Sequence, residues 1–212
     1  MTRHASSQFV SKGRWPRQRL AFSHVLDSDQ TRAYSAPTPD LGCNDGYPMK
    51  IFIISSELTP LGYGGALGTV AGELAQAAAS AGHDVTAVAP FRPEVDPQRH
   101  GLARRLQTVE VSVAHQLAEV TLYEGSLRAR SGRTLLLEHD LFATGENGGE
   151  RQDDEKSAFL LAQAALQLIE GESTPPDVVH CIGWQTGFLP LLLRRHPRLS
   201  SMKLVFTVDD PT

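Results

Sequence analysis

The sequence lacks long hydrophobic runs, clustered cysteines and an excess of basic residues. Its most hydrophobic run, Leu189 to Leu193, is only a few residues long, whereas a helix that crosses a bilayer needs about 20. Cys43 and Cys181 are too few for a disulfide framework or a thiolate zinc site, which favours a reduced, cytoplasmic protein. The 20 Lys and Arg against 24 Asp and Glu give a net charge of −4 without a basic patch. We therefore expect neither a membrane nor a nucleic acid as partner.

The first 48 residues have the composition of a segment outside the fold. Residues 1–26 contain several Arg and Ser and no acidic residue, and residues 27–48 are rich in Pro, Gly, Ser and Asp. Such a composition cannot bury a core and predicts a disordered extension. Its Arg-rich, acid-poor start is also typical of an organellar transit peptide, which would place the protein in a plastid. Met49 directly precedes the first strand-like run, so a wrongly assigned start codon is a third explanation.

From Met49 onward, strand-like and helical patterns alternate along the chain. Short apolar runs predict strands at 49–55, 84–89, 177–181 and 203–208, and apolar residues at helical spacing predict helices over 67–81, 153–170 and 186–195. Three further runs have strand character, at 108–114, 118–123 and 134–137. Strands joined through a helix run parallel. The sequence therefore predicts an α/β fold with a doubly wound, mostly parallel, Rossmann-like sheet over residues 49–212.

A glycine-rich loop, residues 61–68, joins the first strand to the first helix. Backbone N–H groups at a helix N-terminus can bind phosphate, but a tight turn that needs flexible backbone would explain the same glycines. Leu67 stands where a dinucleotide-binding fingerprint has its third glycine, and no Gly-Lys-Ser/Thr follows. These differences disfavour a dinucleotide-dependent oxidoreductase and a Walker-type nucleotide site.

Other candidates follow the two later strands. His180 and Cys181 are neighbours on one strand and point to opposite faces, so they do not form a nucleophile pair. His180 could instead be a hydrogen-bonded structural residue, and Trp184 a packing ring. Asp209 and Asp210 could hold a metal or be solvated, and we expect no metal site.

The order of these motifs resembles the opening of bacterial glycogen synthases and plant starch synthases. That opening runs M-K-I, S-S-E, P, K-T-G-G-L-G-D-V, G-H-D-V and P. The matching segments here are 49–51, 55–57, Gly65, 67–68, 82–85, Pro90, 123–125, 135–142, 154–156, 176–180, Trp184, Gly187, 190–193 and 205–208. The resemblance covers essentially all of residues 49–212.

The resemblance implies the N-terminal, acceptor-side domain of a GT-B glycosyltransferase of family 5. Such enzymes transfer glucose from ADP-glucose to the non-reducing end of an α-1,4-glucan and need no cofactor or metal. By resemblance, the substrate-binding residues are Glu57, Gly64, Gly65, Gly68, His180 and Trp184. The family's active site lies between two domains, so we expect this single domain to require a separately encoded C-terminal donor-binding domain or to come from a truncated gene.

Several charged positions of the family pattern are changed. Tyr63 stands at the lysine of K-T-G-G, Gly183 at the aspartate and Gln185 at the last histidine of H-A-H-D-W-H, and Asp209 at the histidine of F-T-x-H-N. A phenol cannot neutralise donor phosphate near neutral pH. We therefore assign no catalytic residue and expect the chain to be inactive by itself. Two functions stay open: a diverged synthase domain that works with a second domain, or a non-catalytic domain that binds α-glucan or a partner protein.

Overall fold

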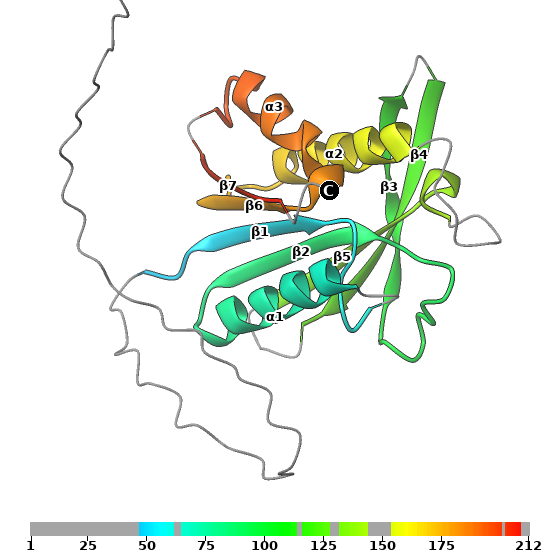
Figure 1. The fold of residues 1–212 in the computed structure, drawn as a ribbon, viewed down its shortest axis with the longest axis horizontal. Helices are drawn as coiled ribbons and strands as arrows, with labels where there is room; N and C mark the ends of the chain where they lie inside the picture. Colours follow the sequence, from blue (N-terminus) through cyan, green and yellow to red (C-terminus); the bar gives the residue numbers. More distant parts are fainter. Residues whose placement is uncertain are drawn as a thin grey trace, which may run out of the picture. The chain divides into compact units, whose positions relative to one another are not determined.

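The computed structural model describes residues 47–61, 65–113, 116–127, 132–143, 154–200 and 202–208. Within these residues, strands and helices alternate along the chain (Figure 1). The strands are β1 (Lys50–Ser55), β2 (Asp84–Pro90), β3 (Ala103–Val113), β4 (Gln116–Ser126), β5 (Gly132–Glu138), β6 (Val178–Ile182) and β7 (Lys203–Thr207). The helices are α1 (Ala66–Ser80), α2 (Asp154–Glu170) and α3 (Phe188–Arg195), with short 3₁₀ turns η1 (Asp140–Phe142) and η2 (Trp184–Thr186).

All seven of these strands belong to one sheet, in the order β3-β4-β5-β2-β1-β6-β7. From β5 to β7 every neighbouring pair is parallel, whereas β4 is antiparallel to both β3 and β5. Short connections can only join antiparallel neighbours, and the segments between β3, β4 and β5 are short. The predicted mostly parallel α/β sheet is confirmed, with an antiparallel extension at one edge.

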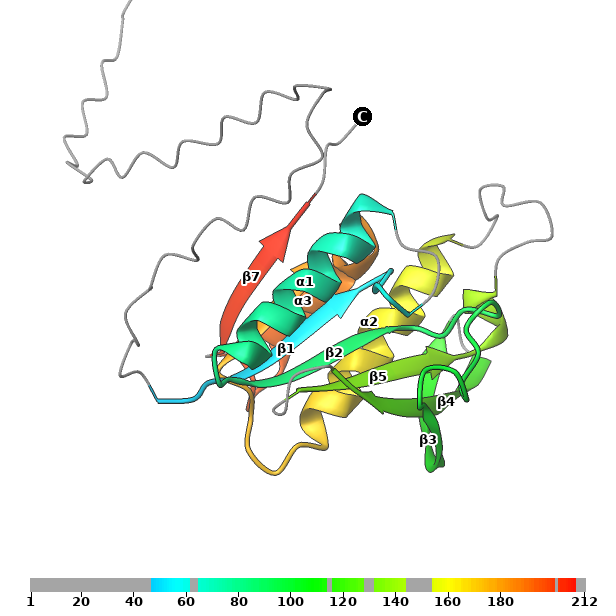
Figure 2. The same ribbon diagram turned by 90° about the horizontal axis from the view of Figure 1, so that it is seen from below.

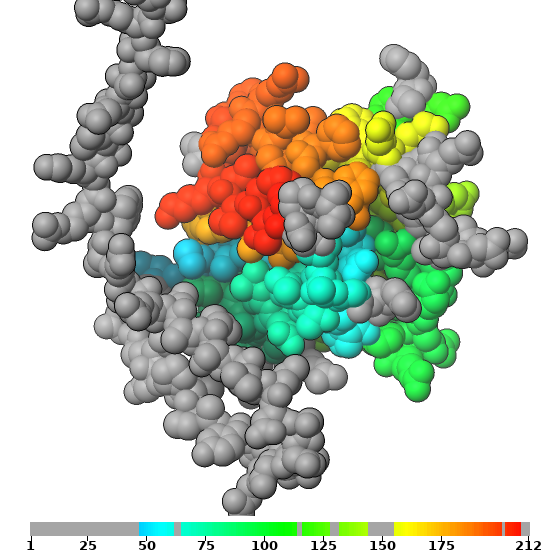
Figure 3. Space-filling model, in the orientation of Figure 1, coloured from blue at the N-terminus to red at the C-terminus, as the bar shows by residue number. Residues whose placement is uncertain are grey.

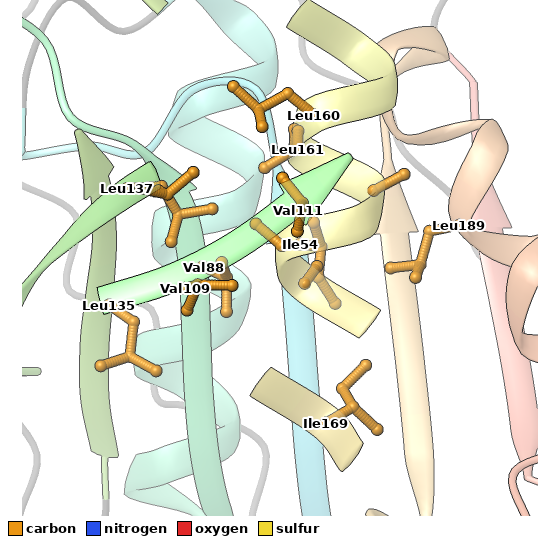
Figure 4. Close-up of a cluster of buried hydrophobic side chains, with 14 of the residues drawn as sticks. Ile54, Val88, Val109, Val111, Leu135, Leu137, Leu160, Leu161, Ile169 and Leu189 are labelled. Carbon is orange, nitrogen blue, oxygen red and sulfur yellow. The ribbon is translucent and has the colours of Figure 1, made fainter. Parts of the chain in front are cut away.

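Helices cover both faces of the sheet. α1 lies on one face, and α2 and α3 lie on the other (Figures 1 and 2). Two hydrophobic clusters fill the two interfaces: Ile54, Val88 and Leu137 point toward α2, among the side chains labelled in Figure 4, while Ile53 and Leu136 belong to the cluster under α1. Consecutive residues of the central strands therefore pack into the hydrophobic clusters on opposite faces of the sheet, as expected of strands that are covered on both faces.

Close contact between α1 and the loop after β1 depends on Gly72. A Cβ placed on Gly72 would lie 2.2 Å from the backbone oxygen of Thr59, so no larger residue fits without a backbone shift. Thr59 also donates hydrogen bonds from its N and its Oγ1 to the carbonyl oxygen of Gly68, each 3.1 Å long. The end of β1 is therefore held directly against the first turns of α1.

The predicted elements differ from the observed ones mainly at their ends. The helix expected over 186–195 is η2 followed by α3, and Pro190 is the third residue of α3, where the first turn makes no use of a proline N–H. β3 begins at Ala103, whereas the sequence predicted a strand from residue 108. The first residues of β3 are solvent-exposed at the sheet edge and carry no apolar pattern, so no signal in the sequence marks them. Of the extension expected over 1–48, only residues 47 and 48 lie within the described residues.

An ionic cluster ties together the amino ends of β1 and β5. Glu172, in the turn after α2, pairs with Lys50 Nζ at 2.7 Å and with Arg133. Burial alone would raise the pKa of Glu172, but the hydrogen bond from Lys50 and the charge of Arg133 together hold that pKa below its usual value. Ion pairs thus join the strands at this end of the sheet. The candidate site lies at the opposite end.

Candidate functional site

The loops that follow β1 and β6 meet at the carboxyl edge of the sheet. β1 and β6 are adjacent and parallel, and Ser55 pairs with Ile182 at their ends. The next residues along each strand, Ser56 and Gly183, therefore start neighbouring loops. In open α/β sheets ligands bind outside the carboxyl ends of the strands. Of the predicted residues, Glu57, Gly65 and Gly68 belong to the segment that leads from β1 into α1, and His180 and Trp184 belong to β6 and the turn after it.

Glu57 reaches across the start of α1. Its Oε2 accepts the backbone N–H of Gly65 at 2.8 Å, and Gly65 is the N-cap residue of α1, with no side chain to cap the helix itself. A carboxylate in this position satisfies an otherwise unpaired N–H and is favoured by the helix dipole. Glu57 thus pairs with the N-cap N–H, as the glutamate of a capping box does, although it comes from the preceding loop.

Both predicted glycines of this loop that the structure describes make room for Glu57. A Cβ on Gly65 would lie 3.1 Å from Glu57 Oε2, and a Cβ on Gly68 would lie 3.0 Å from Glu57 Cβ. These two glycines therefore have a packing role whether or not a phosphate binds, and a phosphate at this helix end would meet the Glu57 carboxylate. Gly64 and Tyr63 lie outside the described residues.

Gly183 adopts a backbone conformation that disfavours the aspartate of the family pattern. Its φ is +86°, a region that residues with a Cβ rarely enter. A Cβ there would lie 3.0 Å from Gln185 Oε1 and 3.2 Å from Leu67 Cδ1. Its N–H donates to the carbonyl oxygen of Thr207 at 2.9 Å, and its own carbonyl accepts Thr186 Oγ1–H at 2.8 Å. The glycine is therefore built into the turn.

His180 is half-buried on β6. Its Nε2 lies 2.8 Å from Thr207 Oγ1 on the adjacent strand β7, and burial lowers the pKa of its imidazole, which favours the neutral ring near pH 7. Cys181 points to the other face and is fully buried, where loss of solvent raises the pKa of its thiol to about 12. The predicted separation of these two side chains is confirmed, and His180 has the hydrogen bond expected of a structural histidine.

Trp184 is not the buried packing ring that the sequence also allowed. Its side chain is 49% exposed, and Phe206 on β7 is 45% exposed. The ring of Phe206 comes within 3.7 Å of the position of a Cβ on Gly187, so it lies against the same turn as Trp184. Figure 3 shows β7, in red, beside the α3 segment, in orange, on the molecular surface. The carboxyl edge of β6 and β7 therefore presents aromatic surface to solvent.

Sequence reasoning assigned no binding role to three residues at this edge: Ser56, Arg92 and Gln185. Arg92 donates to the carbonyl oxygens of Phe142 and Ser56, at 3.1 and 3.5 Å. It follows β2, and the rule that loops after parallel strands gather at one edge could have identified it. Ser56 and Gln185 are notable for buried oxygen atoms without hydrogen-bond partners, a property with no signal in the sequence.

The structure assigns no metal ligands here. Among the described residues, no three His, Cys, Asp or Glu side chains gather in a way that could hold a metal ion. Asp209, like Asp210, lies outside the described residues, so the predictions made for it stay predictions. None of the helices in the described segments is long and apolar enough to cross a membrane.

Two cavities lie in the described part of the chain, one beside β3 and one beside α1. One, of about 640 Å³, lies between β3 and the end of α2, with Arg104, Arg133 and Glu172 among its walls. The other, of about 610 Å³, lies beside α1, with Thr59 and Glu73 among its walls. Neither cavity is lined by a predicted site residue.

Comparisons with known proteins agree with this geometry. Residues 50–209 match the family described as "Starch synthase catalytic domain". A glycogen synthase from Anaeromyxobacter sp. (strain Fw109-5) is 36% identical over 171 residues, covering 76% of this chain and 34% of that protein. One from Geotalea uraniireducens (strain Rf4) is 31% identical over 155 residues, covering 69% and 31%. The chain thus spans about a third of the length of these relatives.

A solved structure has the same fold. The catalytic domain of Starch Synthase IV from Arabidopsis thaliana, bound to ADP and acarbose, superimposes with a TM-score of 0.67 at 24% sequence identity. The likeness covers 77% of this chain and 34% of that one. At this identity the likeness concerns the fold.

Proposed function

Because the chain belongs to the starch synthase catalytic domain family, we propose that residues 49–212 form the acceptor-side half of such an enzyme and bind an α-1,4-glucan at the carboxyl ends of β1, β6 and β7. The exposed ring of Trp184 supplies a flat apolar surface of the kind on which sugar rings stack. The hydrogen-bonding groups of Glu57 and His180 lie at the same edge. Together they suit a neutral ligand that carries many hydroxyl groups.

The second part of the proposal, that these residues do not transfer glucose by themselves, rests on Tyr63, which stands where the family pattern has the lysine of K-T-G-G. Donor diphosphate would be expected at the N-terminus of α1, near the Gly65 N–H that Glu57 accepts at 2.8 Å, and the chain has a phenol where the family pattern has a cationic side chain. Charge stabilisation of the leaving group commonly supplies several kcal/mol of catalysis. Transfer from ADP-glucose would therefore require a C-terminal donor-binding domain to provide the cationic groups. The reaction needs no metal or other cofactor.

The experiment combines binding with turnover. The full chain is titrated with maltoheptaose in a calorimeter and run through polyacrylamide containing amylose, with cellohexaose as the β-linked control. Glucose incorporation from labelled ADP-glucose into glycogen is measured for the chain alone and after mixing with the C-terminal two-thirds of the Anaeromyxobacter relative.

We expect maltoheptaose binding and retarded migration in amylose, no response to cellohexaose, and no incorporation by the chain alone. Absence of maltoheptaose binding would refute the acceptor-side assignment. Incorporation by the chain alone would refute the claim that these residues do not transfer glucose by themselves. Incorporation only in the mixture would identify the chain as a working half of a divided synthase.

A further inference from the structure

Two buried oxygen atoms at the carboxyl edge have no hydrogen-bond partner: Ser56 Oγ and Gln185 Oε1. Ser56 as a whole is only 6% exposed. The large majority of buried polar atoms in folded proteins are paired, and an unpaired one costs free energy that selection removes unless the atom is used. Among the described residues, these two atoms are the ones of this kind at the candidate binding edge, and a ligand there would find them without partners.

Both atoms face the space that Gly183 leaves by having no side chain. The position of a Cβ on Gly183 lies 3.0 Å from Gln185 Oε1 and 3.8 Å from Ser56 Oγ. The two oxygens come from loops 129 positions apart in the sequence and are brought together by the pairing of β1 with β6. Gly183 is itself held in place by its bonds to Thr207 and Thr186, so the backbone of this turn is fixed while the side chain of Gln185 can still rotate.

We propose that Ser56 Oγ and Gln185 Oε1 together bind one hydroxyl group of the glucan, an inference that rests on the proposed function and names its polar subsite. An amide oxygen only accepts hydrogen bonds, whereas a serine hydroxyl donates or accepts. A sugar hydroxyl satisfies both, because it donates to Oε1 and accepts from Ser56. A phosphate oxygen could accept from Ser56 but would be repelled by Oε1 and by the Glu57 carboxylate on Gly65.

The subsite adjoins the exposed aromatic surface. Gln185 follows Trp184 directly within η2 and is itself partly exposed, so its amide can turn without any change in the backbone. A glucose unit stacked on Trp184 would bring its hydroxyl groups to this amide. The amide must turn before a glucan can bind, because both unpaired oxygens are covered in this structure and a ligand could not otherwise reach them.

Stability separates this proposal from a purely structural role. If a hydroxyl is hydrogen-bonded within the fold, its removal lowers the stability of the protein. If a buried hydroxyl has no partner, its removal leaves the stability of the protein unchanged or raises it. The subsite therefore predicts variants that fold as well as the unaltered chain, or better, and yet bind glucan less well.

The test uses the full chain with Ser56→Ala, Gln185→Met and the double variant. Thr134→Val is the matched control, because Thr134 Oγ1 is also buried and unpaired but belongs to the first half of β5, away from the carboxyl edge. Maltoheptaose affinity is measured by calorimetry and the melting temperature by scanning calorimetry. We expect each single variant to bind about five- to tenfold more weakly with an unchanged or raised melting temperature. The double variant should be little worse than either, since both groups hold the same hydroxyl.

The outcomes distinguish the two claims. If the unaltered chain does not bind maltoheptaose, the proposed function fails and the subsite with it. If the unaltered chain binds and the variants bind equally well, or Thr134→Val loses as much affinity, the subsite alone is wrong. If affinity and melting temperature fall together in both single variants, the two side chains are structural and the subsite is again refuted.

Discussion

Replacing Glu57 tests whether its carboxylate closes the N-terminus of α1 to anions. Glu57→Gln keeps an oxygen that can accept the Gly65 N–H, now 2.8 Å from Oε2, and removes only the charge, so it should cost about 0.3–1 kcal/mol of stability through the helix dipole. Glu57→Ala removes the hydrogen bond as well and should cost about 1–2 kcal/mol. Urea denaturation measures both losses, and the alanine variant should be the less stable of the two.

The same pair of variants should change anion affinity in a defined direction. A phosphate about 5 Å from the carboxylate would be repelled, for one pair of like charges, by roughly 1 kcal/mol if bulk water screens the pair and by about 3 kcal/mol at the effective dielectric constant typical of a protein surface. Glu57→Gln should therefore bind ADP or pyrophosphate about tenfold more tightly than the unaltered chain in low salt, with the difference shrinking as salt is added. Calorimetric titration provides the measurement.

Glu73→Gln is the control for this experiment, because it makes the same charge change on an exposed position of α1. It should leave ADP affinity unchanged. The reasoning is wrong if Glu57→Gln and the unaltered chain bind ADP equally, if neither binds it at all, or if the control gains as much affinity as Glu57→Gln.

Three further predictions concern the framework around the site. Gly72→Ala should destabilise the chain by about 3 kcal/mol or more, although alanine is the better helix former, because its Cβ would lie 2.2 Å from the Thr59 oxygen; a more stable variant in urea denaturation would contradict this packing. Glu172→Gln should cost about 1–2 kcal/mol at pH 7. Because the folded pKa of Glu172 is lowered, that contribution is present above the unfolded pKa and disappears as the pH falls through the folded pKa, so the free energies of unfolding of the variant and the unaltered chain should converge as the pH falls below 4.5. Cys181, buried with a thiol pKa of about 12, should resist maleimide at pH 8 until the chain is unfolded, as read by peptide mass spectrometry.

Much of the fold follows from local periodicity. The apolar run of β1, the helical spacing of α1 and the glycine that ends it are all readable in the sequence, and Gly82 has the positive φ, +93°, expected of a helix-ending glycine. The opposite orientation of His180 and Cys181 follows from strand geometry alone. Local patterns were least informative for β3, where exposed residues at the sheet edge carry no apolar alternation, and the helix predicted from residue 186 proved to begin with a 3₁₀ turn.

The sequence predicted where the candidate site lies, but it did not predict the side-chain contacts within that site. The rule that ligands gather at the carboxyl ends of parallel strands pointed to the loops with Glu57 and Trp184. It could not tell that Glu57 would turn back to cap α1, or that Ser56 and Gln185 would be left unpaired. Those facts depend on where side chains from loops distant in the sequence meet.

The amino-acid order by itself determined which segments become strands and helices, because alternation and helical spacing are properties of neighbouring residues. It also determined the family, through motifs that keep their order over residues 50–209. Only the tertiary structure decided what the edge can bind, because the pairing of β1 with β6 places Ser56 beside Gly183. The folding of the loop onto α1 likewise sets the Glu57 carboxylate where an anion would bind, and hydrogen bonds and charges act through distance in space and not along the chain.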